Sequence, residues 1–124
     1  MEVMTMRALM NNVIFLARKE KNRADRQYGP IRSDHEGYGV LAEEIQELQD
    51  EVSIFTEKYA MECILRAIRD GDHAEMEAGL QVLGQKALHA AAEAIQIAAV
   101  CERYMELVTE EANEDGNDLE GKQQ

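Results

Sequence analysis

The stretch at residues 33–55 reads SDHEGYGVLAEEIQELQDEVSIF, and it decides the fold class of the chain. Ser33 and Glu36 have the spacing of a capping box, in which the serine oxygen accepts an N–H of the first helical turn and the glutamate bonds back. Apolar residues then recur at steps of three and four. We therefore expect a long helix that begins near Asp34.

The same periodicity predicts a helix before this stretch. Apolar residues at helical spacing occupy residues 3–27, with a charged second half. The sequence Tyr28-Gly29-Pro30 then predicts the end of that helix, because Gly suits a helix C-terminus and Pro cannot continue the hydrogen-bond ladder.

The pattern also continues after the stretch. The second helix either extends to Ile68 or bends near residues 53–56. A second capping box at Asp72 to Glu75 predicts a third helix over residues 73–111, in which Gly84 is a candidate break. No segment has the sustained alternation of a strand. We expect an all-α bundle of three long helices, or of four to five if the long ones break.

Length and composition indicate one folded domain. The chain has 124 residues, of which 45% are apolar, too many for a disordered protein. We expect a single all-α domain over residues 1–112 and a disordered acidic tail over residues 113–124, where the periodicity ends. Two isolated cysteines, Cys63 and Cys101, indicate free thiols in a reduced cytoplasm rather than a disulfide framework.

The charge excludes several partners. Thirteen basic and 25 acidic residues give a net charge of −12, which argues against a nucleic-acid polymer and against an anionic membrane surface. No run approaches the length of a membrane span. Residues 1–32 hold seven basic and three acidic residues, a local charge of +4, which leaves −16 for residues 33–124. Acidity of this degree permits cation binding.

Three carboxylates of the second helix lie in its apolar stripe. On an α-helix, Glu44, Glu47 and Glu51 fall within about 60° of one another, on the face that also carries Leu48. Like charges on a buried face repel and lose solvation, so they need compensation. A divalent cation such as Mg²⁺, which prefers hard oxygen ligands, supplies it.

The third helix offers a second half of such a site. Glu93 lies in an alanine-rich, almost uncharged stretch, and Gln96 follows it by three residues. Paired i, i+3 side chains on two adjacent helices can share a metal inside a bundle.

These residues resemble a known family. The chain looks like a MazG-like protein, one of the all-α nucleoside triphosphate pyrophosphohydrolases, over roughly residues 28–104. The family pattern is Glu-Glu-x-x-Glu on one helix and Glu-x-x-Asp on the next. The matching motifs are Tyr28-Gly29-Pro30, Ser33, His35-Glu36-Gly37-Tyr38, Val40-Leu41, Glu43-Glu44, Glu47-Leu48, Asp50-Glu51-Val52 and Glu93-Ala94-Ile95-Gln96-Ile97-Ala98-Ala99.

The resemblance implies hydrolysis of a (deoxy)nucleoside triphosphate to monophosphate and pyrophosphate, by a cytoplasmic homo-oligomer that is a dimer or a tetramer. Mg²⁺, with Mn²⁺ as the alternative ion, would be held by Glu44, Glu47 and Glu93, with Gln96 at the fourth ligand position. Either Glu43 or Asp50 would serve as the general base. Lys86, His89 and Arg103 are the candidates for contact with the substrate.

Two departures from the family pattern support an alternative. Gln96 stands where the family has Asp, and a neutral amide is a weaker ligand for a hard cation. The connection between Glu47 and Glu93 is also longer than the family's usual one. The alternative is therefore a catalytically weakened or inactive MazG-like protein that acts as a nucleotide-binding or protein-interaction module.

Overall fold

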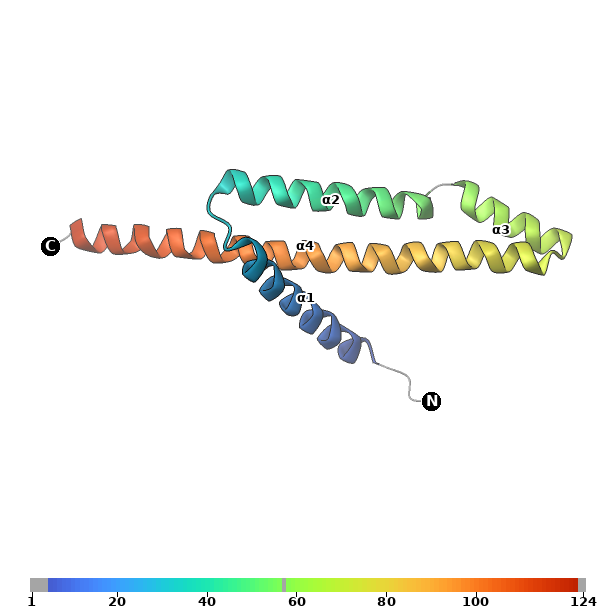
Figure 1. Cartoon of the computed structure of the whole chain (residues 1–124), viewed down its shortest axis with the longest axis horizontal. Coiled ribbons are helices and arrows are strands. Elements are labelled where there is room, and N and C mark those ends of the chain that lie inside the picture. The colour runs from blue at the N-terminus through green and yellow to red at the C-terminus, as the bar shows by residue number, and fades with distance from the viewer. Residues whose placement is uncertain (1–4, 57, 123–124) are drawn as a thin grey trace. The chain divides into compact units, whose positions relative to one another are not determined.

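The structure is a computed structural model that describes residues 5–56 and 58–122, apart from the side chains of residues 54–60 and 117–122. The described residues form helices and their connections, with no strand among them, so the predicted all-α class is confirmed. There are four helices in the described part of the chain, shown in Figure 1: α1 (Met6–Tyr28), α2 (Asp34–Thr56), α3 (Lys58–Asp70) and α4 (His73–Lys122).

Helix α1 begins and ends on local signals. The Thr5 hydroxyl accepts a hydrogen bond of 3.1 Å from the Ala8 N–H and so caps the first turn. At the other end Gly29 adopts a φ of 76°, and its N–H donates to the Asp25 carbonyl at 2.9 Å. The predicted end of the helix at Tyr28 is confirmed, because the backbone turns where only Gly does so without strain.

Helix α2 begins at the predicted capping box. The Ser33 hydroxyl accepts the Glu36 N–H at 3.1 Å, and the helix starts at Asp34 as expected. The Glu36 carboxylate accepts from the Arg32 N–H at 3.2 Å instead of from that of Ser33, so the return bond is shifted by one residue.

The long apolar segment that begins at Asp34 forms two helices, α2 and α3. Of the two alternatives, an uninterrupted helix and a bend near residues 53–56, the second is confirmed, since α2 ends at Thr56 and α3 begins at Lys58. Helix α3 ends in a Schellman motif: the Gly71 N–H donates to the Ile68 carbonyl and the Asp72 N–H to the Ala67 carbonyl. The Asp72 carboxylate then accepts the Glu75 N–H at 3.0 Å and starts α4.

Helix α4 differs from the expected third helix in two respects. It is continuous through Gly84. One Gly costs about 1 kcal/mol relative to Ala, which is too little to end a helix that continues for many residues on both sides of it. It also extends to Lys122, eleven residues beyond the expected end at residue 111; the disorder expected for residues 113–124 stays a prediction. Extension of an existing helix adds one hydrogen bond for each residue, whereas the costly nucleation step is already complete.

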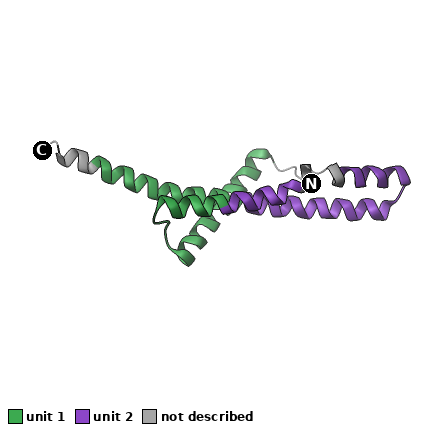
Figure 2. Cartoon of the chain, turned by 90° about the horizontal axis from the view of Figure 1, so that it is seen from above, with its two compact units in different colours: residues 1–42, 95–124 green, residues 43–94 purple. Residues whose placement is uncertain are grey.

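Residue contacts group the chain into two compact units, which Figure 2 colours separately. Unit 1 comprises Met1–Ala42 and Ile95–Gln124, and unit 2 comprises Glu43–Ala94. Helices α2 and α4 each contribute residues to both units. The single domain expected over residues 1–112 stays a prediction.

Polar contacts and one close approach hold unit 1 together. The buried Arg103 guanidinium donates to the Asp25 carboxylate and to the Gly29 carbonyl, both at 2.9 Å. Gly37 of α2 lies against the ring of Tyr104, where a Cβ would overlap the ring atoms. The Tyr104 hydroxyl donates to the Asp34 carboxylate at 2.9 Å, so the start of α2 is joined to α4.

Unit 2 is built on small residues at its helix contact. Ala67 of α3 is fully buried and Ala90 of α4 nearly so. Gly79 of α4 faces Ile64 of α3, where a Cβ would come within 3.2 Å of the Ile64 side chain. Small side chains let helix backbones approach closely, and this contact joins α3 to α4. Within the described chain no helix has the length and apolarity that crossing a membrane requires.

Candidate metal centre

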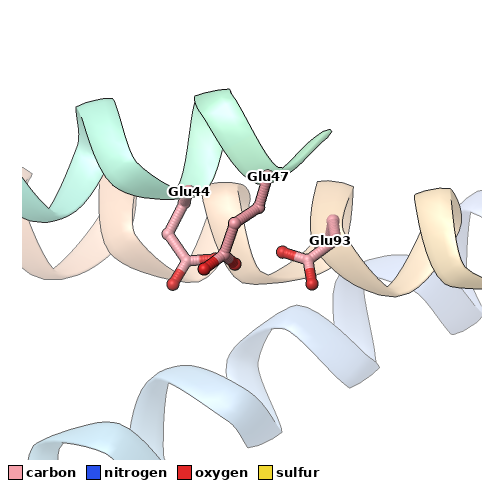
Figure 3. A group of neighbouring side chains, drawn as sticks. All are labelled: Glu44, Glu47 and Glu93. Carbon is pink, nitrogen blue, oxygen red and sulfur yellow. The ribbon is translucent and has the colours of Figure 1, made fainter. Parts of the chain in front are cut away.

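Three carboxylates of unit 2 converge from two helices. Helix α2 places Glu44 and Glu47 one turn apart on the same face, and α4 contributes Glu93 opposite them. One oxygen of each carboxylate lies within 4.8 Å of the other two. In Figure 3 the side chains of Glu44 and Glu47 extend from α2, and their carboxylates lie next to that of Glu93. The structure thus brings together three of the four predicted metal ligands.

The triad is partly shielded from solvent. Glu44 and Glu93 are half-buried, whereas Glu47 is exposed. The Oε2 atoms of Glu44 and Glu93 are inaccessible to solvent and have no hydrogen-bond partner among the described residues. Because a buried carboxylate oxygen without a partner costs free energy, the arrangement is incomplete without a proton or a cation.

The pKa values of Glu44 and Glu47 also indicate that the triad needs a proton or a cation. Burial raises the pKa of Glu44 from its ordinary 4.5 to about 7, and the neighbouring carboxylates of Glu47 and Glu93 raise it further. The pKa of Glu47 is also raised, chiefly by the neighbouring carboxylate of Glu93. Negative charges that repel one another in this way are the environment in which a bound cation is stabilising.

The donor set fits a hard divalent ion. Carboxylate oxygens bind Mg²⁺ and Ca²⁺ at about 2.0–2.6 Å, so two oxygens on one ion lie at most about 4–5 Å apart. The spread of the triad, 4.8 Å, falls in that range. The group can therefore hold a metal ion.

A fourth acidic residue extends the row along α2. Glu51 lies one turn beyond Glu47, and its carboxylate is 3.6 Å from the Lys86 ammonium of α4. Glu51 follows Glu44 by seven residues, and Lys86 precedes Glu93 by seven. Seven residues are about two helical turns, and α2 and α4 run antiparallel here. The Glu51–Lys86 ion pair therefore lies about two turns away from the Glu44–Glu93 pair along both helices. The sequence contained this spacing, but without the register of the two helices it did not predict the ion pair.

The two candidate general bases lie beside the triad on α2. Glu43 and Asp50 are both exposed. The Asp50 carboxylate accepts a hydrogen bond of 3.0 Å from the Gln46 side chain on the preceding turn. Neither belongs to the converging group, and the choice between them stays open.

The remaining predicted site residues have separate positions. His89 is exposed on the part of α4 that belongs to unit 2. Gln96 is half-buried on α4 in unit 1, one turn after Glu93. Arg103, predicted to contact substrate, has a structural role in unit 1, since its side chain is only 7% exposed and is bonded to Asp25 and Gly29. No local pattern in the sequence predicts that pairing, because 78 residues separate Arg103 from Asp25.

Comparison with known proteins identified no relative: no family model, curated protein or solved structure matches this chain.

Proposed function

We propose that this chain is a Mg²⁺-dependent hydrolase that cleaves a nucleoside triphosphate to the monophosphate and pyrophosphate. The observation that carries the proposal is the convergence of Glu44, Glu47 and Glu93 within 4.8 Å. The motif resemblance to MazG-like proteins supplies the substrate class and the reaction.

The candidate site residues of unit 2 have different roles in this proposal. Glu44, Glu47 and Glu93 would hold the cation, which when bound neutralises phosphate charge and makes an attacking water more acidic. Glu43 or Asp50 would accept the proton of that water as its oxygen attacks the α-phosphorus. The bond from the α-phosphorus to the bridging oxygen breaks, and pyrophosphate leaves with the electron pair.

Lys86 is the cation of this helix pair best placed to contact phosphate. Its side chain is 45% exposed, and at 3.6 Å its ion pair with Glu51 is long. Lys86 is exposed, whereas the Glu51 Oε2 atom of the pair is shielded from solvent and has no hydrogen-bond partner among the described residues. Transfer of Lys86 to a phosphate oxygen of the substrate would therefore leave that Glu51 oxygen without its cation, at a cost that the bound phosphate must offset.

The proposal is tested by product analysis. The full-length chain is incubated with Mg²⁺ and each common (d)NTP, and monophosphate and pyrophosphate are measured separately by chromatography and by coupled pyrophosphatase. We expect equal amounts of both products and a loss of at least a hundredfold in rate for Glu93→Gln. Glu77→Gln, an exposed glutamate on the same helix, is the matched control and should keep the wild-type rate within twofold.

The second candidate function is a non-catalytic nucleotide-binding or interaction module, and Gln96 is the residue that favours it. Absence of turnover with every nucleotide would contradict the hydrolase proposal and favour the module. The Gln96→Asp variant refines the result, because it restores the carboxylate of the family pattern. A gain of tenfold or more in rate would identify Gln96 as the cause of a weakened site.

A further inference from the structure

The carboxylate of Glu51 on α2 depends on Lys86 of α4 for the neutralisation of its charge. The Glu51 Oε2 atom lies 3.6 Å from the Lys86 ammonium. That oxygen is inaccessible to solvent and has no hydrogen-bond partner among the described residues. Because a shielded carboxylate oxygen without a partner costs free energy, the ionised form of Glu51 relies on this one cation.

Lys86 depends less on Glu51 than Glu51 depends on Lys86. The side chain of Lys86 is 45% exposed, whereas that of Glu51 is 25% exposed. An exposed ammonium on a flexible four-carbon stem stays solvated when it leaves its partner. The ammonium can therefore turn toward another anion, and the cost of that change falls on Glu51.

The ion pair and the metal centre are close enough for one phosphate chain to reach both. Glu51, Lys86 and the triad all belong to unit 2. Along each helix, seven residues separate the pair from Glu44 and Glu93, which is about 10 Å. The long stem of Lys86 covers part of this distance, and a triphosphate bound to the cation by one phosphate extends its other phosphates away from it.

The other basic residue in this part of α4 has a different role. Between residues 73 and 111 the basic residues are Lys86 and Arg103. The Arg103 side chain is buried and donates to Asp25 and Gly29 of unit 1. Lys86 is therefore the cation of this segment that can exchange one anion for another.

We infer that Glu51 sets the affinity of the site for phosphate, as a positioning residue that holds Lys86 in the substrate-free protein. A phosphate that binds Lys86 displaces the Glu51 carboxylate, which then loses its cation. Glu51 is thus an internal competitor of the substrate. The inference rests on the proposed function, because it takes the phosphate chain of the substrate as the competing anion.

The fraction of molecules in which Glu51 holds Lys86 determines the size of the effect. When a ligand binds only the molecules whose Lys86 is free, its dissociation constant increases by the reciprocal of their fraction. A Glu51 that holds Lys86 in about four of five molecules thus weakens phosphate binding about fivefold. Glu51→Gln removes the charge with almost no change in shape and should recover this factor.

Isothermal titration calorimetry of the full-length chain measures the effect. The probe is diimidotriphosphate, an inorganic triphosphate whose bridging nitrogens resist hydrolysis, in the presence of Mg²⁺. We expect Glu51→Gln to lower its dissociation constant at least fivefold and Lys86→Gln to raise it at least fivefold. Glu77→Gln, which removes an exposed negative charge of α4, is the matched control and should stay within twofold of the wild type. An ion pair with a structural role alone would change the melting temperature without tightening the binding of the probe.

The double variant Glu51→Gln/Lys86→Gln distinguishes competition from simple repulsion. Loss of a nearby carboxylate weakens the repulsion of an anion, and that effect persists without Lys86. Competition requires Lys86, so Glu51→Gln should change the dissociation constant less than twofold in the Lys86→Gln background. A fivefold gain that persists in that background would overturn the inference, as would a Glu51→Gln variant that binds the probe no more tightly than the wild type.

The result is separable from the test of the hydrolase. Coupling between Glu51 and Lys86 in probe binding supports the inference even when no nucleotide is cleaved, because the probe is not a substrate. Nucleotide cleavage without this coupling would overturn the inference and leave the hydrolase proposal intact. A wild-type chain that does not bind the probe would also overturn the inference, and product analysis then decides the hydrolase proposal separately.

Discussion

Glu44 of α2 and Glu93 of α4 present carboxylate oxygens within 4.8 Å of each other, although 49 residues separate them in the sequence. Each also has a second oxygen, Oε2, that is shielded from solvent and has no hydrogen-bond partner in the described structure. Two half-buried acids at this distance destabilise the ionised state of each other. A stable fold with this pair therefore needs a proton or a cation between the helices.

The first prediction concerns the pH dependence of metal-free protein. The pKa of Glu44 is about 7 in the fold and near its ordinary 4.5 when unfolded. The folded state thus binds more protons between these values, so the free energy of unfolding falls as the pH rises from about 4.5 to about 7. Glu44→Gln should remove this part of the slope and raise the melting temperature at pH 8.

Thermal unfolding in EDTA across this pH range measures the effect. Glu77→Gln serves as the control, because it removes an exposed glutamate of the same unit, and should reproduce the wild-type slope. Parallel curves for the wild type and Glu44→Gln would contradict the raised pKa.

The second prediction concerns the contact of α2 with Tyr104. A Cβ on residue 37 would overlap the Tyr104 ring, whereas a Cβ on residue 39 would meet nothing within 4 Å. Gly37→Ala should therefore destabilise the fold by about 1–3 kcal/mol. Gly39→Ala on the same helix should stabilise it by up to about 1 kcal/mol. Urea unfolding distinguishes the two, and a Gly37→Ala variant as stable as the wild type would refute the close approach.

The third prediction concerns the buried Arg103. Its partner Asp25 accepts its Nε at 2.9 Å, and Asp25→Ala would leave a charge that is 93% buried without its carboxylate. We expect a loss of about 3 kcal/mol in the free energy of unfolding. Glu20→Ala removes the partner of Arg23, whose side chain is 51% exposed, and should cost less than about 1 kcal/mol. Similar losses for both variants would show that burial does not distinguish the two pairs.

Local signals explain how much of the fold the sequence predicted. The caps at Ser33 and Asp72 and the turn at Gly29 act within a few residues, so the helix boundaries there follow from sequence alone. The end of α2 at Thr56 and the start of α3 at Lys58 matched one of two alternatives, because the apolar pattern continues from one helix into the next. The helix beyond residue 112 was missed, since acidic residues without an apolar stripe carry no periodic signal.

The sequence likewise predicted some features of the candidate site and not others. Glu44 and Glu47 share a face because of helical geometry, which depends only on their spacing. The approach of Glu93 to them depends on how α2 and α4 align in unit 2, and the resemblance supplied that pairing before the structure did. The Glu51–Lys86 pair and the Arg103–Asp25 pair depend on helix register and on long-range packing, for which one sequence has no signal.

Titration with Mn²⁺ followed by electron paramagnetic resonance tests the metal centre most directly, because the signal reports the free ion without any requirement for catalysis. We predict that the wild type binds Mn²⁺, that Mg²⁺ competes for the site, and that Glu44→Gln and Glu93→Gln each weaken binding at least tenfold, while Glu77→Gln does not. A free-ion signal unchanged by the wild-type protein, or equal binding by all four proteins, would contradict the assignment of Glu44, Glu47 and Glu93 as a cation site.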